Sequence, residues 1–150
     1  MVAPIRGMYF EEFEVGLEIR TGARTITETD IVNFAGLSGD YNFIHINAVA
    51  AADTPFGGRV AHGMLVASIA TGLAVQQGFI DGTTLAFRDL NWKFTKPVFI
   101  DDTIYVQVKV VETKAMARLG GGIVTFEARV MNQNSEVVHK GEWRMLIKSR

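Results

Sequence analysis

Asp40 and His45 lie five positions apart in a stretch where polar residues interrupt apolar ones, residues 34–45. A carboxylate and an imidazole are the pair of groups best suited to moving a proton near neutral pH. Phe43 and Ile44 between them predict apolar surroundings, in which both groups can be tuned for catalysis. The spacing also fits a structural arrangement, with Asp40 capping the loop and His45 as a partly buried, hydrogen-bonded histidine.

A second candidate, Gly63, follows His62 at the expected start of a long apolar helix. Backbone N–H groups in the first turn of a helix lack intrahelical partners and lie at the positive end of its dipole. Because glycine has no side chain, a ligand oxygen can approach these groups closely. Gly63 is therefore a candidate oxyanion site, and the structural alternative is that it eases packing.

The elements that position these residues are mostly helical. Thr27 is a good N-cap for a first short helix, with Asp30 completing a weak capping box. Gly39 and its neighbours in residues 36–42 predict the loop that carries Asp40. Asn47 predicts a cap for a helix over residues 48–52. The long apolar helix is expected over residues 62–77, with Gly78 as its stop.

The second half of the chain changes to a period of two, which is typical of strands with one apolar and one polar face. The predicted strands cover residues 17–25, 85–98, 104–110, 124–130 and 142–148. An antiparallel sheet with one hydrophobic helix against its apolar face gives an α+β fold. The absence of a linker or repeat predicts one domain over residues 1–150.

Composition excludes several classes of protein. The 150 residues are 48% hydrophobic and 21% charged, with a formal net charge of -1, so neither nucleic acid nor an anionic membrane is an expected partner. Residues 60–80 contain no Asp, Glu, Lys or Arg, as a membrane span would require. Their polar residues nevertheless favour a buried core helix over a membrane span. The chain has no cysteine and residues 1–8 do not read as a signal peptide, so a cytoplasmic location is expected.

Both candidate stretches resemble a known family, the MaoC-like dehydratases and (R)-specific enoyl-CoA hydratases, also called hydratase 2. The family motif runs through Gly-Asp-x-Asn-Pro, an aliphatic residue and His. The chain fills it in register with Phe34, Leu37, Ser38, Gly39, Asp40, Asn42, Ile44, His45 and Ala51. Residues 62–64 and residues 94–98 are also similar, and the likeness runs from about Tyr9 to Lys148. Phe43 replaces the usual proline.

The resemblance implies a hot-dog fold, in which a curved antiparallel sheet wraps around one long helix. It implies reversible hydration of a trans-2-enoyl-CoA to an (R)-3-hydroxyacyl-CoA, as in fatty acid metabolism. Asp40 would activate the water with His45 as its partner, although the two roles can be exchanged. The Gly63 N–H would bind the thioester oxygen. A homodimer or a higher homo-oligomer is implied. Coenzyme A belongs to the substrate, so no separate cofactor is expected.

Supporting residues follow from the same comparison. Asn42 is expected to fix the loop, and Ser68 and Thr71 are candidates to support Asp40 or His45 from the long helix. Hydrogen bonding of either hydroxyl to its own helix is the alternative. Phe43 gives up the stiffness of proline, which bears on the pose of the loop.

The remaining polar residues are given no catalytic role. His62 is expected to cap or pack, and His139 is expected to face solvent. No cluster with metal-ligand spacing is visible, so no metal is predicted. Residues 120–122 predict a hairpin turn. Four cations are candidates for contact with coenzyme A phosphates, although each also fits an ordinary solvated charge: Arg88, Lys93, Lys96 and Arg118.

Two rival functions remain at this stage. A hot-dog thioesterase usually carries its acidic residue on the central helix, but residues 64–77 contain none. A non-catalytic acyl-thioester-binding module would leave Asp40 and His45 without a purpose. Acyl carrier protein is an alternative to coenzyme A as the carrier.

Overall fold

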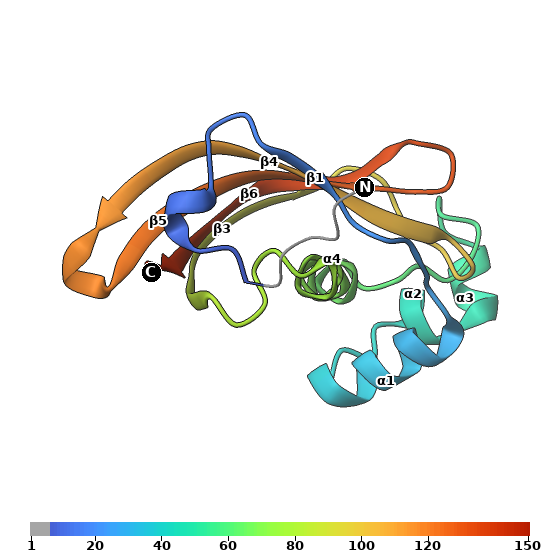
Figure 1. Ribbon diagram of the computed structural model, residues 1–150. Coiled ribbons are helices and arrows are strands. Elements are labelled where there is room, and N and C mark those ends of the chain that lie inside the picture. The colour runs from blue at the N-terminus through green and yellow to red at the C-terminus, as the bar shows by residue number, and fades with distance from the viewer. Residues whose placement is uncertain (1–6) are drawn as a thin grey trace.

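The computed structural model describes residues 7–150, which form one curved sheet and a small set of helices (Figure 1). The α-helices are α1 (Glu28–Ser38), α2 (Phe43–Ile46), α3 (Ala48–Ala52) and α4 (Gly63–Gln77), and the 3-10 helices are η1 (Phe10–Glu12) and η2 (Ala117–Leu119). The strands are β1 (Glu18–Arg20), β2 (Arg24–Thr25), β3 (Thr84–Phe94), β4 (Thr103–Met116), β5 (Gly121–Met131) and β6 (Val137–Lys148).

The six strands form one antiparallel sheet in the order β1-β4-β5-β6-β3, and β2 also pairs with β4. Figure 1 shows the sheet arching over α4, which lies against its concave face. The α+β prediction of a curved antiparallel sheet around one long helix is therefore confirmed. Strand β3 is at one edge of the sheet, with β6 as its single strand neighbour in residues 7–150.

The core lies between the concave face of the sheet and α4. Phe126 and Trp143 on the inner face of the sheet are 0% and 1% exposed, and Val66 and Ala70 on α4 are both fully buried. Burying large apolar side chains contributes roughly 1.5–3 kcal/mol each, which fixes α4 against the sheet. The first turn of α4 is thereby fixed in position as well.

The helices α1, α2 and α3 lie together on one side of α4 (Figure 1). The expected capping box is present at α1: the Asp30 N–H donates to Thr27 Oγ1 at 3.1 Å, and the Thr27 N–H donates to the Asp30 carboxylate at 2.9 Å. Gly39 ends α1 with a φ of 78°, a left-handed conformation that glycine adopts without strain. The chain then turns back toward the start of α4.

Several predicted boundaries were wrong. Strands β4, β5 and β6 are longer than the predicted strands 104–110, 124–130 and 142–148, and β5 begins at Gly121, inside the predicted turn at residues 120–122. Residues 17–25 form β1 and β2 and not one strand, because the Thr21 hydroxyl accepts the Val106 N–H at 2.9 Å in place of a backbone group. Strand β3 ends at Phe94, since the N–H groups of Thr95 and Lys96 both donate to the Val138 carbonyl and break the ladder. The four-residue helix α2 has no periodicity and was not predicted.

None of the helices in residues 7–150 combines the length and hydropathy needed to span a bilayer. The expectation that no signal peptide begins the chain concerns residues 1–8, of which residues 1–6 lie outside the described range.

Candidate active site

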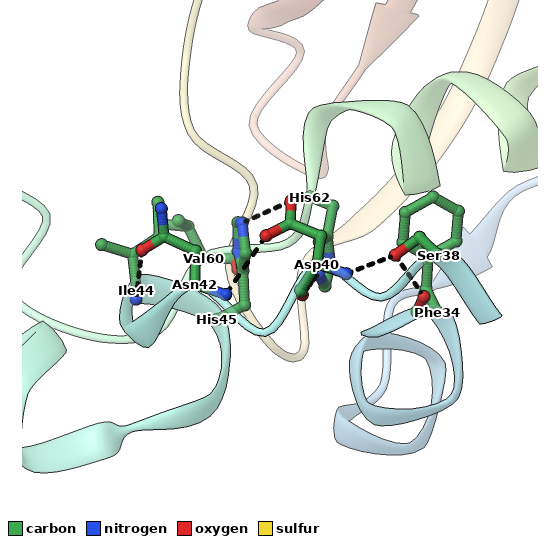
Figure 2. Close-up of polar contacts among 8 residues, drawn as sticks. All are labelled: Phe34, Ser38, Asp40, Asn42, Ile44, His45, Val60 and His62. Atoms are coloured by element: carbon green, nitrogen blue, oxygen red, sulfur yellow. Dashed lines mark hydrogen bonds and ion pairs between the residues drawn. The ribbon is translucent and has the colours of Figure 1, made fainter. Parts of the chain in front are cut away.

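Hydrogen bonds between near neighbours shape the loop that carries Asp40. Ser38 Oγ donates to the Phe34 carbonyl at 2.7 Å and accepts the Asp40 N–H at 3.1 Å. The Asp40 carboxylate accepts the Asn42 N–H at 3.1 Å through Oδ1, and Asn42 in turn caps α2 by accepting the Ile44 N–H at 3.4 Å. Asn42 thus fixes the loop as expected. These local bonds leave Oδ2 of Asp40 directed at His45 (Figure 2).

The structure brings Asp40 and His45 together. Asp40 Oδ2 lies 3.8 Å from His45 Nε2, and the side chains are 51% and 9% exposed respectively. His45 Nδ1 lies 2.7 Å from the Val60 carbonyl, which only accepts, so Nδ1 carries the proton and Nε2 of the neutral ring has a free lone pair. The 3.8 Å separation exceeds a direct hydrogen bond but lets both atoms contact one water.

His62 joins this pair, contrary to the expectation that it only caps or packs. Its ring stacks on that of His45 with centroids 3.7 Å apart and planes at 23°. Its Nε2 donates to the Asp40 backbone carbonyl at 2.9 Å, while its side chain makes no capping bond at α4. His62 is 2% exposed, and its Nδ1 is buried without a hydrogen-bond partner among residues 7–150. It therefore fastens the Asp40 loop to the start of α4.

The fold creates a cluster of groups that could ligate a metal ion. One such atom from each of Asp40, His45 and His62 lies within 4.8 Å of the others, which the spacing along the sequence did not reveal. The ring orientation is poor for a shared ion. Stacked imidazoles direct their lone pairs side by side and not toward a common point, and one nitrogen of each ring already bonds a backbone carbonyl. A site without a metal stays our prediction.

The first turn of α4 has free N–H donors. His62 provides no side-chain cap, and the Gly63 N–H donates to no group among residues 7–150. Gly63 also has a packing role, since a Cβ at this position would lie 2.5 Å from Cε1 of Phe94. Both readings of Gly63 thus have support: the donor is available, and the Phe94 ring occupies the space that a side chain would need.

A cavity of about 760 Å³ connects these groups. Asp40, His45, His62 and Gly63 line one part of it. The rest is largely apolar, with side chains that include Phe34, Ile44, Phe56, Met64, Phe94 and Val98. Polar groups that converge in a mostly apolar cavity of this size are typical of a small-molecule site.

His139 also lines the cavity. It is buried, so the expectation that it faces solvent was wrong. Its position on β6 is in phase with the buried Trp143 and Met145, a signal that was present in the sequence. Trp92 Nε1 donates to His139 Nδ1 at 3.0 Å. Burial lowers the pKa of His139 to about 4, so its ring is neutral at physiological pH.

Ser68 and Thr71 do not contact the pair. Ser68 Oγ donates to the Met64 carbonyl and Thr71 Oγ1 to the Ser68 carbonyl, each at 2.7 Å. Neither residue lines the cavity, so the helix back-bonding alternative describes both.

Phe43, where the family has proline, is the first residue of α2. Proline is favoured at this position of a helix, because its fixed φ is helical and its missing N–H would have no intrahelical partner. Asn42, with φ -53° and ψ 137°, has the conformation that a following proline requires. The loop therefore keeps the geometry that proline would impose.

Comparisons with known proteins identify the family of the chain. The family model described as MaoC like domain matches residues 12–132. Protein MaoC of Klebsiella aerogenes is 44% identical over 100 residues, 67% of this chain and only 30% of that protein. The 3-hydroxybutyryl-CoA dehydratase of Methylorubrum extorquens is 39% identical over 113 residues, 75% of this chain and 69% of the relative.

Solved structures give the same result. The R-hydratase of Pseudomonas aeruginosa has a TM-score of 0.81 and 30% identity, covering 97% of this chain and 89% of that one. A Mycobacterium tuberculosis protein described as a double hotdog fold has a TM-score of 0.83 at 17% identity, over 96% of this chain and 45% of that one, which supports the fold alone. The relatives' names agree with the predicted enzyme class, hydro-lyase. The chain belongs to the MaoC-like domain family and has the hot-dog fold.

Proposed function

We propose that this protein is a hydro-lyase that adds water reversibly across the double bond of a trans-2-enoyl thioester and forms an (R)-3-hydroxyacyl thioester. The observation that carries the proposal is the 3.8 Å approach of Asp40 Oδ2 to His45 Nε2 in a cavity that reaches the uncapped start of α4. Relatives named 3-hydroxybutyryl-CoA dehydratase and R-hydratase support the reaction class.

The two side chains present two acceptors to one water. The Asp40 carboxylate accepts one O–H and the unprotonated Nε2 of His45 accepts the other, which leaves an oxygen lone pair free to attack C3. The water oxygen bonds to C3 as the Asp40 carboxylate takes one of its protons, and the electrons of the C2=C3 double bond move to C2 and the thioester carbonyl. C2 then takes up that proton, relayed from Asp40 through His45, as the carbonyl re-forms. We favour Asp40 as the base and His45 as the group that orients the water and relays the proton. Dehydration reverses each step.

Negative charge grows on the thioester oxygen as C3 is attacked. We assign the donor to that oxygen to the Gly63 N–H, which lies at the positive end of α4. One such donor contributes roughly 3 kcal/mol to stabilising a transition state. The Phe94 ring, which contacts Gly63, borders this position and would exclude water from it.

Absorbance of the conjugated thioester tests the proposal with purified protein and crotonyl-CoA. We expect the enoyl band to disappear while the thioester stays intact, with (R)-3-hydroxybutyryl-CoA as the product. Release of free thiol would identify a thioesterase instead. No reaction with crotonyl, longer or branched enoyl thioesters would leave the non-catalytic binding module as the better description.

We also propose a homodimer formed through β3. This edge strand places apolar side chains on the concave face where α4 does not cover them. Phe87, Leu90 and Phe94 are 41%, 47% and 54% exposed, although their partners His139, Trp143 and Met145 on β6 are buried. A long, unpaired edge is a template for pairing with another chain, and an exposed apolar patch marks an interaction site. Light scattering should give twice the monomer mass of 16.5 kDa, and Leu90→Lys should shift it toward the monomer.

The carrier and location complete the proposal. Coenzyme A is the carrier that we favour, and the acyl-thioester substrate is the only small molecule that the reaction requires besides water. The absence of cysteine fits a reducing compartment, and we place the protein in the cytoplasm on that basis.

A further inference from the structure

Cations line up across the convex face of the sheet, on the side opposite α4. Lys93 on β3 pairs in register with Lys140 on β6, which pairs with Arg129 on β5. Gln107 on β4 and Arg20 on β1 continue the same row. Directly paired residues in antiparallel strands share a face, and like charges placed opposite each other are destabilising. The row contains no carboxylate.

The next row along the sheet has the opposite character. It contains Glu142, Glu127 and Glu18, with Asn91 and Lys109. Charges of both signs are therefore present on this face, but they are sorted into separate rows and not interspersed as on an ordinary solvated face. This sorting concentrates positive charge at the end of the sheet near residues 94–96.

A hollow of about 370 Å³ lies at this end, which we call the basic hollow; it is lined by Thr95, Lys96, Arg129, Val137 and Lys140. Thr95 and Lys96 also line the active-site cavity, so the basic hollow adjoins it around the end of β3. A ligand with its reactive end beside Asp40 would therefore bring its other end toward these cations.

Two of the surrounding cations lack an acidic partner. Lys96 pairs with Glu136, and Arg129 pairs with Glu127 at 2.9 Å. Lys93 and Lys140 form no ion pair with any residue in 7–150. Four cations and two carboxylates leave a positive balance, which an anion with several charges would neutralise.

We propose that the basic hollow, together with Lys93, binds the phosphate groups of the coenzyme A thioester whose acyl end occupies the active-site cavity. The proposal rests on the proposed function for the identity of the carrier. Lysine and arginine are the usual ligands of phosphate in proteins, and charge-assisted hydrogen bonds supply the affinity. Of the four cations considered from sequence, this assigns Lys93 and Lys96 and leaves Arg88 and Arg118 without a role.

The test compares two substrates that differ in their phosphates. Crotonyl-CoA carries them and crotonyl-pantetheine does not, so the ratio of their kcat/KM values isolates the phosphate contribution. We expect the Lys93→Gln/Lys140→Gln double variant to lower this ratio roughly tenfold, the effect of losing one or two charge-assisted bonds. Added salt should lower the ratio of the wild-type protein as well.

A matched control separates local contacts from net charge. Lys114→Gln/Lys148→Gln removes the same charge from exposed lysines at the far end of β4 and β6. This variant should keep the wild-type ratio. An equal fall in both double variants, or no fall in the Lys93/Lys140 variant, would overturn the proposal. Preference for an acyl-carrier-protein thioester, with the crotonyl-CoA values unaffected by the variants, would overturn the choice of coenzyme A.

Direct binding keeps this inference distinguishable from the proposed reaction. Adenosine 3′,5′-bisphosphate, measured by calorimetry, probes the basic hollow without any chemistry. Should the wild-type protein hydrate neither thioester, weaker binding of this probe to the Lys93/Lys140 variant would still support the phosphate site. Equal binding to both proteins would refute it.

Discussion

The active-site cavity has two walls of different origin. The loop wall, residues 38–45, is polar and is shaped mostly by hydrogen bonds between residues two to four positions apart. The strand wall, made of residues 94–98 and His139, is mainly apolar and forms only when β3 and β6 pair. In the proposed reaction the loop wall carries the groups that move protons, and the apolar residues of the strand wall exclude water around them.

The difference is also electrostatic. The loop wall presents a carboxylate that is half exposed, whereas the histidine of the strand wall is buried and neutral with a pKa of about 4. The charge of the strand wall lies on Lys96, which pairs with Glu136. His45 and His139 line the same cavity, but their surroundings give them different proposed roles. His45 relays a proton in the proposed reaction, whereas His139 stays neutral.

Removing the carboxylate of the loop wall should have the largest effect. Asp40→Asn keeps the size of the side chain but abolishes its ability to take a proton from water. We expect a loss of about a hundred- to ten-thousandfold in kcat for hydration, with an unchanged melting temperature. Steady-state kinetics with crotonyl-CoA measure it. Full activity in this variant would remove Asp40 from the mechanism and end the distinction between the walls.

His139 tests the strand wall through the pH dependence of stability. Its pKa is about 4 in the folded protein and about 6.5 when unfolded, so below pH 6.5 the unfolded state takes up a proton that the folded state does not. The free energy of unfolding should fall by about 3 kcal/mol between pH 6.5 and pH 4 from this residue.

Denaturant titrations of wild type and His139→Asn across this pH range measure that difference. The substituted amide does not titrate, so the curve of the variant shows only the other titratable groups, among them Asp30 and Glu136, whose pKa values are lowered. Parallel curves for the two proteins would show that His139 does not titrate as a buried, neutral group.

His62 fastens the loop wall to the start of α4, because its Nε2 donates to the Asp40 carbonyl. His62→Phe keeps a ring against His45 but loses this donor. We expect kcat to fall roughly tenfold with little change in KM, since the loss of one hydrogen bond displaces the base and not the substrate. His62→Gln, which retains a donor, should recover part of the rate. Equal rates for the two variants would assign His62 to packing alone.

Phe43→Pro should give the smallest change and sharpens the description of the loop wall. The Phe43 N–H donates no hydrogen bond within residues 7–150, and Asn42 already has a conformation compatible with proline. We expect stabilisation of about 0.4–1 kcal/mol, because proline restricts the unfolded chain. Thermal melting measures it. Destabilisation would show that the Phe43 side chain, 49% exposed, contributes more than its backbone geometry.

The sequence by itself determined the loop wall and the main elements. Helix α4, the long strands and the residues of the Asp40 loop were all predicted, because periodicity, caps and turn residues act over a few positions. The burial of His139 could also have been predicted, because it is in phase with Trp143 and Met145, but it was expected to face solvent. Helix α2 was missed, since one turn leaves no periodic signal.

Only the tertiary structure decided how distant residues meet at the site. The proton position on His45 depends on the Val60 carbonyl, 15 residues away, and the anchoring of Asp40 depends on His62, 22 residues away. The Phe94 ring reaches Gly63, and Lys93, Lys140 and Arg129 align, through the register of β3, β6 and β5. Such contacts have no fixed spacing along the chain, because packing the sheet on α4 sets them.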